Sequence, residues 1–185
     1  GKSTLARRVA EDLIEKDLNV HWVQLDAYCD VHEAMKRMEA DASQILDVEG
    51  YASSFQHENV ALVFDDVHSI SSRHQDSFSS LFKALEHHSI PFMLLGRDRD
   101  TFSIDGTYVE LGPLEQTDAI ELLNPELGDE RETIVDALGG HPLAILLHDA
   151  STPLPETNLD VRAYVDQVVL GEASADVHDA MSPFL

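Results

Sequence analysis

The chain has 185 residues, 43% of them hydrophobic and only one of them a cysteine (Cys29), so it can form a substantial core but no internal disulfide and no cysteine-based zinc site. Thirty-five acidic residues against twelve basic ones give a formal net charge of −23, which makes a poor general binder of nucleic acid because a phosphate backbone needs positive charge opposite it. No apolar run approaches the roughly 20 residues that a membrane-spanning helix requires, and no basic and then apolar leader opens the chain, so we expect a cytoplasmic protein without a membrane partner.

The first quarter of the chain predicts a helix, a strand and a second helix. Apolar residues recur at helical spacing over residues 4–16, and a short β-prone run follows at 20–25. Residues 30–48 again carry apolar side chains in helical register, and residues 50–59 read as a loop.

The middle of the chain predicts three buried strands and one helix. Residues 60–64 are continuously apolar and end in two acids, which is typical of a strand buried on both faces of a parallel sheet. A helix follows for which Ser71 or Ser72 could be the N-cap, and residues 91–95 and 108–111 read as further strands. Strands that alternate with helices indicate an α/β fold with a parallel sheet flanked by helices.

The last third predicts helices only. One helix contains residues 114–123, a second contains 134–138 and ends at Gly139 and Gly140, a third begins near Pro142 and continues over 143–150, and a fourth spans 161–170. Residues 151–157 contain two prolines and are the best candidate for a linker.

The first four residues match the end of a phosphate-binding loop, the Walker A motif G-x-x-x-x-G-K-[ST]. Gly1, Lys2, Ser3 and Thr4 lead directly into the first predicted helix, whose N-terminus offers unpaired N–H groups and a positive dipole to a phosphate. Lys2 can reach the β- and γ-phosphates, Ser3 can place its hydroxyl on Mg²⁺, and Thr4 can contact the α-phosphate side. A lysine that stands beside a helix start by chance is the alternative.

The strand at residues 60–64 with the acids that follow it matches a Walker B motif. Asp65 is placed to hold Mg²⁺, and Asp66 to orient or deprotonate the attacking water. A strand that ends in solvated acids is the alternative, and it is common in so acidic a chain. Because the two motifs stand some sixty residues apart with a strand between them, together they predict nucleotide binding far more specifically than either does alone.

The order of these motifs resembles that of STAND ATPases, the signalling NTPases of the AAA+/NB-ARC group, over nearly the whole chain. By this resemblance Arg97, at the end of the strand at 91–95, would sense the γ-phosphate, and Pro142, in a GLPLA-like stretch with His141 in place of leucine, would pack near adenine. A surface arginine and a simple stop and restart of a helix explain the same residues without a ligand. The resemblance implies a P-loop core at 1–112, a helical lid at 113–150, and a linker with the start of a C-terminal domain of the winged-helix kind at 151–185.

The ends and the charge suggest where the chain comes from. It opens without methionine inside the phosphate-binding loop and closes on apolar residues, so we expect an internal fragment of a longer protein that lacks the first strand of the fold. Such a fragment should bind ATP poorly, and binding at low micromolar concentration or below by the isolated chain would contradict this. Acids spread along the whole chain are typical of a halophilic, above all a haloarchaeal, protein, and an acidic mesophilic protein is the alternative.

The expected function is a slow ATP-dependent signalling switch with Mg²⁺·ATP as its ligand, such as a transcriptional regulator that reaches DNA only through another segment. A protein partner or self-association is expected with it. The alternatives are a mechanical AAA+ ATPase, for which Arg73 or Arg99 could supply an arginine finger, and a non-catalytic scaffold that nucleotide stabilises. The ten histidines show no helical zinc-site spacing, and Cys29 is expected to be a small core residue.

Overall fold

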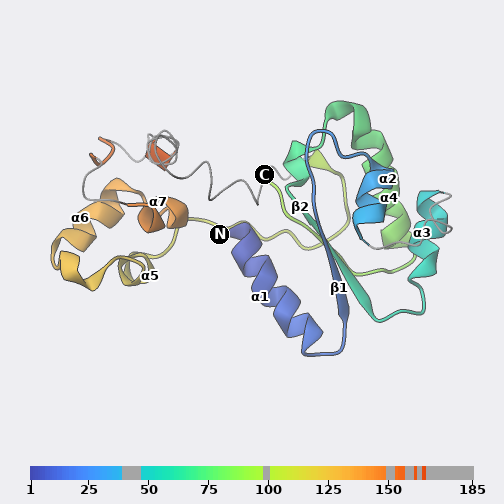
Figure 1. Cartoon of the computed structure of the whole chain (residues 1–185), viewed down its shortest axis with the longest axis horizontal. Helices are drawn as coiled ribbons and strands as arrows, with labels where there is room; N and C mark the ends of the chain where they lie inside the picture. Colours follow the sequence, from blue (N-terminus) through green and yellow to red (C-terminus); the bar gives the residue numbers. More distant parts are fainter. Residues whose placement is uncertain (39–46, 98–100, 149–152, 157–160, 162–163, 166–185) are drawn as a thin grey trace. The chain divides into compact units, whose positions relative to one another are not determined.

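The computed structural model describes residues 1–38, 47–97, 101–148, 153–156, 161, 164 and 165. The chain forms two compact units, Lys2–Val109 and Glu110–Leu185, and Gly1 groups with the second unit. The first unit is an α/β domain and the second is helical, and each has its own core (Figure 1). No helix within the described residues is both long and apolar enough to cross a membrane.

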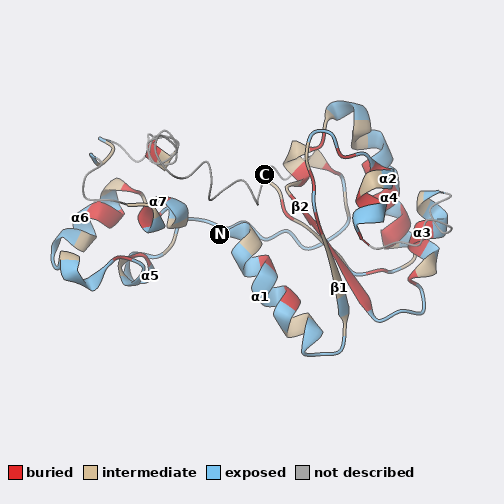
Figure 2. Cartoon of the chain, in the orientation of Figure 1, coloured by how far each residue is buried: buried red, intermediate tan, exposed pale blue. Residues whose placement is uncertain are grey.

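The α/β unit is built on a parallel sheet of three strands in the order β1-β2-β3. Strand β1 spans Asn19–Gln24, β2 spans Val60–Asp65 and β3 spans Phe92–Leu94. Strand β2 is central and is buried at every position, as its continuous apolar run predicts (Figure 2). The predictions of a parallel α/β sheet and of these three strands are therefore confirmed.

Helices cover both faces of this sheet. Helix α1 (Lys2–Ile14) packs on one face through a small cluster. Helices α2 (Val31–Arg37), α3 (Val48–Ser54) and α4 (Gln75–His87) contribute to the large core on the other face. The largest side chains of that core are buried aromatics and methionines: Tyr51, Phe64, Phe78, Phe82, Met35 and Met38.

Two local predictions in this part of the α/β unit are wrong, and a third is seen in part. The loop predicted at 50–59 contains most of α3, because Asp47 caps the helix by accepting the Gly50 N–H and because Tyr51 is fully buried. The predicted serine cap is not used: Ser71 precedes a short 3₁₀ helix (Ser72–His74), and α4 begins at Gln75 without a side-chain cap. The predicted helix at 30–48 is seen as α2, and residues 39–46 lie outside the described residues.

The strand predicted at 108–111 is also wrong. These residues form no strand, and Tyr108, Val109 and Leu111 are exposed. A strand gains its stability from pairing and from a covered face, and the apolar side chains of this segment are not covered.

The helices predicted for the second unit are seen near their expected positions, which confirms that prediction. It contains α5 (Gln116–Glu121), a 3₁₀ turn (Pro125–Leu127), α6 (Glu130–Ala137) and α7 (Pro142–Leu146). Helix α7 ends earlier than predicted, and residues 149–150 lie outside the described residues, as do most of the predicted linker at 151–157 and of the predicted helix at 161–170.

Candidate functional site

Helix α1 presents a free, positively polarised N-terminus. It begins at Lys2 and has no acidic residue in its first turn, so no carboxylate of the helix itself offsets the positive end of its dipole. Lys2 and Thr4 are exposed, Ser3 is half-buried, and Gly1 has open space around it. This end of the helix can therefore accept an anion from solvent.

Packing fixes which end of the sheet this N-terminus occupies. Ala6 is 1% exposed and lies in one cluster with Val63 of β2 and Leu95 beyond β3. Helix α1 runs antiparallel to β1, to which a tight turn joins it (Figure 1). The start of α1 therefore lies at the edge of the sheet where the strands end.

The periodicities of helix and strand then place the predicted ligands on one face. Ser3 precedes Ala6 by three residues, so it lies on the same, sheet-facing side of α1, one turn closer to the N-terminus. Asp65 follows Val63 by two residues, so it lies on the face of β2 that α1 covers, one step closer to the strand end. Ser3 and Asp65 thus share one face and one edge of the sheet.

Asp65 is a buried carboxylate at the centre of that edge. The residue is 7% exposed, and its Oδ1 accepts the N–H of Asp66 at 2.9 Å. Its main-chain carbonyl accepts the N–H of Leu25 at 2.9 Å, while the N–H of Leu95 bonds the carbonyl of Phe64 on the other side at 2.9 Å. Its Oδ2 has no hydrogen-bond partner among the described residues, which leaves a hard oxygen ligand of the kind that Mg²⁺ prefers.

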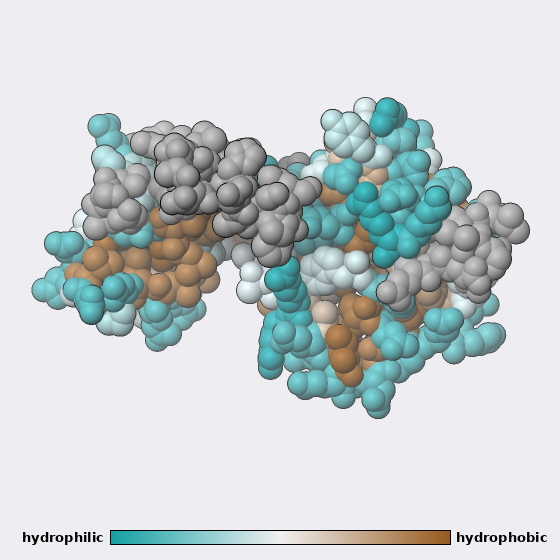
Figure 3. Space-filling view, viewed as in Figure 1, coloured by the Kyte–Doolittle hydropathy of each residue, from teal (hydrophilic) through white to brown (hydrophobic). Residues whose placement is uncertain are grey.

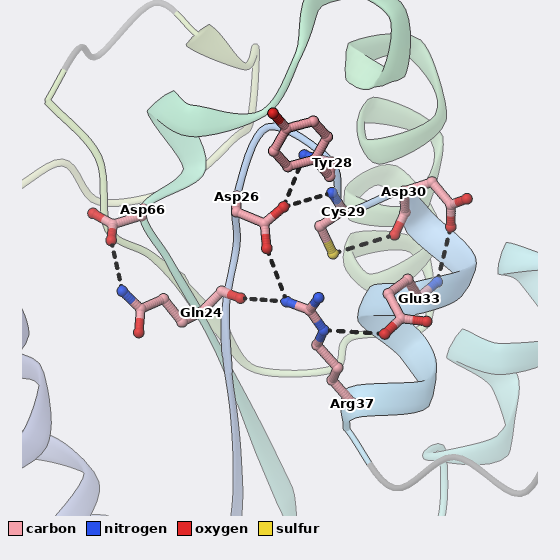
Figure 4. A network of polar contacts seen from close by, with 8 residues as sticks. All are labelled: Gln24, Asp26, Tyr28, Cys29, Asp30, Glu33, Arg37 and Asp66. Atoms are coloured by element: carbon pink, nitrogen blue, oxygen red, sulfur yellow. Dashed lines mark hydrogen bonds and ion pairs between the residues drawn. The ribbon is translucent and has the colours of Figure 1, made fainter. Parts of the chain in front are cut away.

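Asp66 turns the chain out of the strand. Its backbone is left-handed, with φ 60° and ψ 37°, a conformation that aspartate tolerates better than most residues. Its Oδ2 accepts the side-chain amide of Gln24 at 3.1 Å (Figure 4). Because Gln24 is in register with Asp65, the two acids come together at the end of β2 and do not diverge to opposite faces.

A second polar network braces the end of β1 (Figure 4). Arg37 donates from Nη1 to the Gln24 carbonyl at 3.2 Å and to Asp26 at 3.3 Å, and from Nε to Glu33 at 3.2 Å. The hydrogen bond from the Tyr28 N–H and, to a smaller degree, the one from Arg37 lower the pKa of Asp26. Sequence reasoning missed this network, for which the only signal is the four-residue spacing of Glu33 and Arg37 on a helix.

Arg97 lies beyond the end of β3, at the same edge of the sheet. It is exposed, and neither Arg97 nor Lys2 forms an ion pair within the part of the chain that the structure describes. Leu95, two residues earlier, accepts the N–H of Val67 at 3.0 Å, which ties the β3 end to the segment that follows the acids. The sensor role predicted for Arg97 stays a prediction. Arg99 lies outside the described residues, and Arg73 donates to its neighbour His74.

In the second unit, backbone geometry accounts for the stretch around Pro142. Gly139 and Gly140 have φ of 55° and 64°, Pro142 opens α7, and His141 caps that helix by accepting the Ala144 N–H at 3.2 Å. The contact with adenine that the resemblance implies for Pro142 stays a prediction.

The remaining candidate groups are the thiol of Cys29 and the side chains that could bind a metal. Cys29 is 1% exposed, as expected for a core residue, and burial raises the pKa of its thiol. No group of three or more histidine, cysteine or acidic side chains within the described ranges could hold a metal ion. Mg²⁺ does not require one, because it keeps several waters and takes one or two carboxylates together with phosphate oxygens.

A concavity lined by described residues lies elsewhere on the α/β unit. It has a volume of about 610 Å³ and lies along the first half of β1, and its lining includes Ile14, Leu18 and Trp22. Figure 3 shows hydrophobic side chains beside the end of α1 in this region. We place the candidate site at the acidic edge, because neither the start of α1 nor the acids Asp65 and Asp66 line this concavity.

No protein-family model matches the chain, and no curated protein matches it. The resemblance to STAND ATPases therefore rests on the sequence motifs alone and stays a prediction.

Proposed function

We propose that this chain is the nucleotide-binding part of a STAND-type P-loop ATPase that binds Mg²⁺·ATP and acts as a slow signalling switch. The observation that carries the proposal is the shared position of Ser3 and Asp65 on one face and one edge of a parallel sheet. Ligands of α/β proteins bind outside the carboxyl ends of the strands, which is where this edge lies.

Each residue at the edge has a role that its chemistry allows. The N–H groups at the start of α1 and the Lys2 ammonium bind phosphate oxygens. The Ser3 hydroxyl and the Asp65 carboxylate would hold the magnesium ion, whose contribution is to neutralise charge on the β- and γ-phosphates. Arg97 is free to make a charge-assisted contact with the γ-phosphate.

Hydrolysis would use the second acid. The oxygen of a water forms a bond to the γ-phosphorus, the bond from that phosphorus to the β–γ bridging oxygen breaks, and the bridging oxygen keeps the electron pair. Asp66 orients the water and accepts its proton. An aspartate reaches less far than a glutamate, which fits a slow switch better than a motor.

The test is the affinity for Mg²⁺·ATP of the full-length gene product, measured by calorimetry for Lys2→Ala and Asp65→Asn. Each variant removes a charged partner of the ligand, so we expect affinity to fall about 10- to 100-fold. Lys16→Ala, beyond the other end of α1, and Asp76→Asn, in the first turn of α4, are the matched controls and should bind like the wild type. Wild-type affinity in both site variants would show that the assignment is wrong.

The rate of ATP hydrolysis separates the proposed switch from the mechanical ATPase and from the non-catalytic scaffold. A rate of many ATP per second would favour the mechanical ATPase, and tight binding with a rate near zero would favour the scaffold.

A further inference from the structure

His68 carries a buried nitrogen that the structure leaves without a hydrogen bond. It belongs to the short 3₁₀ helix Val67–Ser69 that follows the acid pair, and its side chain is 19% exposed. Its Nδ1 is the only side-chain nitrogen or oxygen within the described residues that is fully buried and unpartnered. Such a group destabilises the folded state unless a partner comes within reach, so a charged side chain close to it is informative.

The carboxylate of Asp66 lies close to this nitrogen. The distance from His68 Nδ1 to Asp66 Oδ1 is 3.8 Å, while the other oxygen, Oδ2, accepts the amide of Gln24 at 3.1 Å. Each oxygen of Asp66 therefore faces a different nitrogen. An unprotonated Nδ1 would direct its lone pair at a carboxylate, so the tautomer with the proton on Nδ1 is the favoured one. A movement of less than about 1 Å would then complete a hydrogen bond from Nδ1–H to Asp66 Oδ1.

We propose that His68 is a positioning residue for Asp66: its Nδ1–H and the Gln24 amide together hold the carboxylate in the orientation from which it receives the proton of the attacking water. The inference rests on the proposed function in one respect, namely that Asp66 is the base. The strand end cannot fix this orientation by itself, because the left-handed turn at Asp66 takes its side chain out of the alternation of β2.

The first experiment does not depend on nucleotide. Long-range ¹⁵N–¹H NMR of the ring reports which nitrogen of neutral His68 carries the proton. We expect Nδ1–H in the wild type and a shift to Nε2–H in Asp66→Gly, which removes the carboxylate but suits the backbone φ of 60°. Nε2–H in the wild type, unchanged in Asp66→Gly, would overturn the inference.

The second experiment uses substitutions that move the donor. In His68→Asn the side-chain amide nitrogen stands where Nδ1 stands, whereas in His68→Gln it lies one bond further out and in His68→Ala it is gone. We expect kcat for ATP hydrolysis by the full-length protein to fall about 10- to 100-fold in the Gln and Ala variants, with the Kd for Mg²⁺·ATP unchanged. His68→Asn should retain kcat within about threefold, as should the control His87→Ala, an exposed histidine on α4.

The outcomes separate the two proposals. Wild-type kcat in His68→Ala, in a protein that binds and hydrolyses ATP, overturns the role of His68 and leaves the proposed function standing. A wild-type protein that binds no Mg²⁺·ATP overturns the proposed function and, with it, the role of His68. An equal loss of kcat in the Asn and Ala variants would also overturn the inference, because the donor position would then not matter.

Discussion

Replacing Ala6 by leucine tests the packing on which the site depends. Ala6 is 1% exposed, and its cluster partners Val63 and Leu95 are 1% and 8% exposed, so three additional carbon atoms have no room at this contact. Overpacking of this kind costs about 1–3 kcal/mol. Because only Ala6 and Ala10 of α1 are buried, the helix should yield before the sheet does.

If the strain displaces the start of α1 from the acids, the same 1–3 kcal/mol appears as about 5- to 150-fold weaker binding of Mg²⁺·ATP. Ala10→Leu makes an equal change one turn further from the phosphate end, and Val9→Leu makes a smaller one at an exposed position. Urea denaturation gives the free energy of unfolding, and calorimetry gives the affinity. We expect both leucine variants at the alanines to be less stable than Val9→Leu, and Ala6→Leu to lose more affinity than Ala10→Leu.

Two outcomes would refute this reasoning. Ala6→Leu as stable as Val9→Leu would show that the contact is not tight. Equal affinities in Ala6→Leu and Ala10→Leu, despite a loss of stability, would show that this contact does not hold the phosphate end of α1 in place.

Two further predictions concern stability away from the site. Gly140→Ala should destabilise the helical unit by about 2–4 kcal/mol in urea denaturation. The reason is that φ at Gly140 is 64° and that a Cβ there would meet the Leu114 carbonyl oxygen at 2.6 Å. The control is Gly112→Ala, which has open space around it and should change stability by less than about 0.5 kcal/mol. Asp30→Ala should cost about 1 kcal/mol at neutral pH, since Asp30 caps α2 by accepting the Glu33 N–H. That hydrogen bond lowers the pKa of Asp30 in the folded state. The difference in the free energy of unfolding between wild type and Asp30→Ala should therefore be full above the unfolded pKa of about 3.9 and should disappear as pH falls through the lower folded pKa. A difference that persists in acid would contradict this.

The parts of the fold that sequence predicts best are those whose burial is complete. Strand β2 is apolar at every position up to the acids because both of its faces are covered, and α4 shows a clear helical period because one side of it packs on the large core. In both cases the local pattern and the tertiary environment favour the same structure.

The errors arise where tertiary contacts decide. The composition around Gly50 favours a loop, yet burial of Tyr51 stabilises α3. Residues 108–111 have the β-propensity of a strand but no covered face. At the site, the two acids are visible in the sequence, whereas the approach of Gln24 and His68 to Asp66 depends on the pairing of β1 with β2 and on a left-handed turn, which no local pattern encodes.

The two halves of the candidate site, the acids at the end of β2 and the start of α1, differ in how strongly the rest of the fold fixes their positions. The acids end a central strand that hydrogen-bonds to neighbours on both sides, and this strand is buried throughout. Helix α1 has 13 residues, a length at which an isolated helix is marginal in water, and it rests on two buried alanines. A ligand that binds both halves therefore adds most of its stabilisation to the position of α1, because the acids are already fixed before it arrives. If the proposed function holds, movement of α1 relative to the sheet, and not rearrangement of the acids, is the conformational change that bound nucleotide would control.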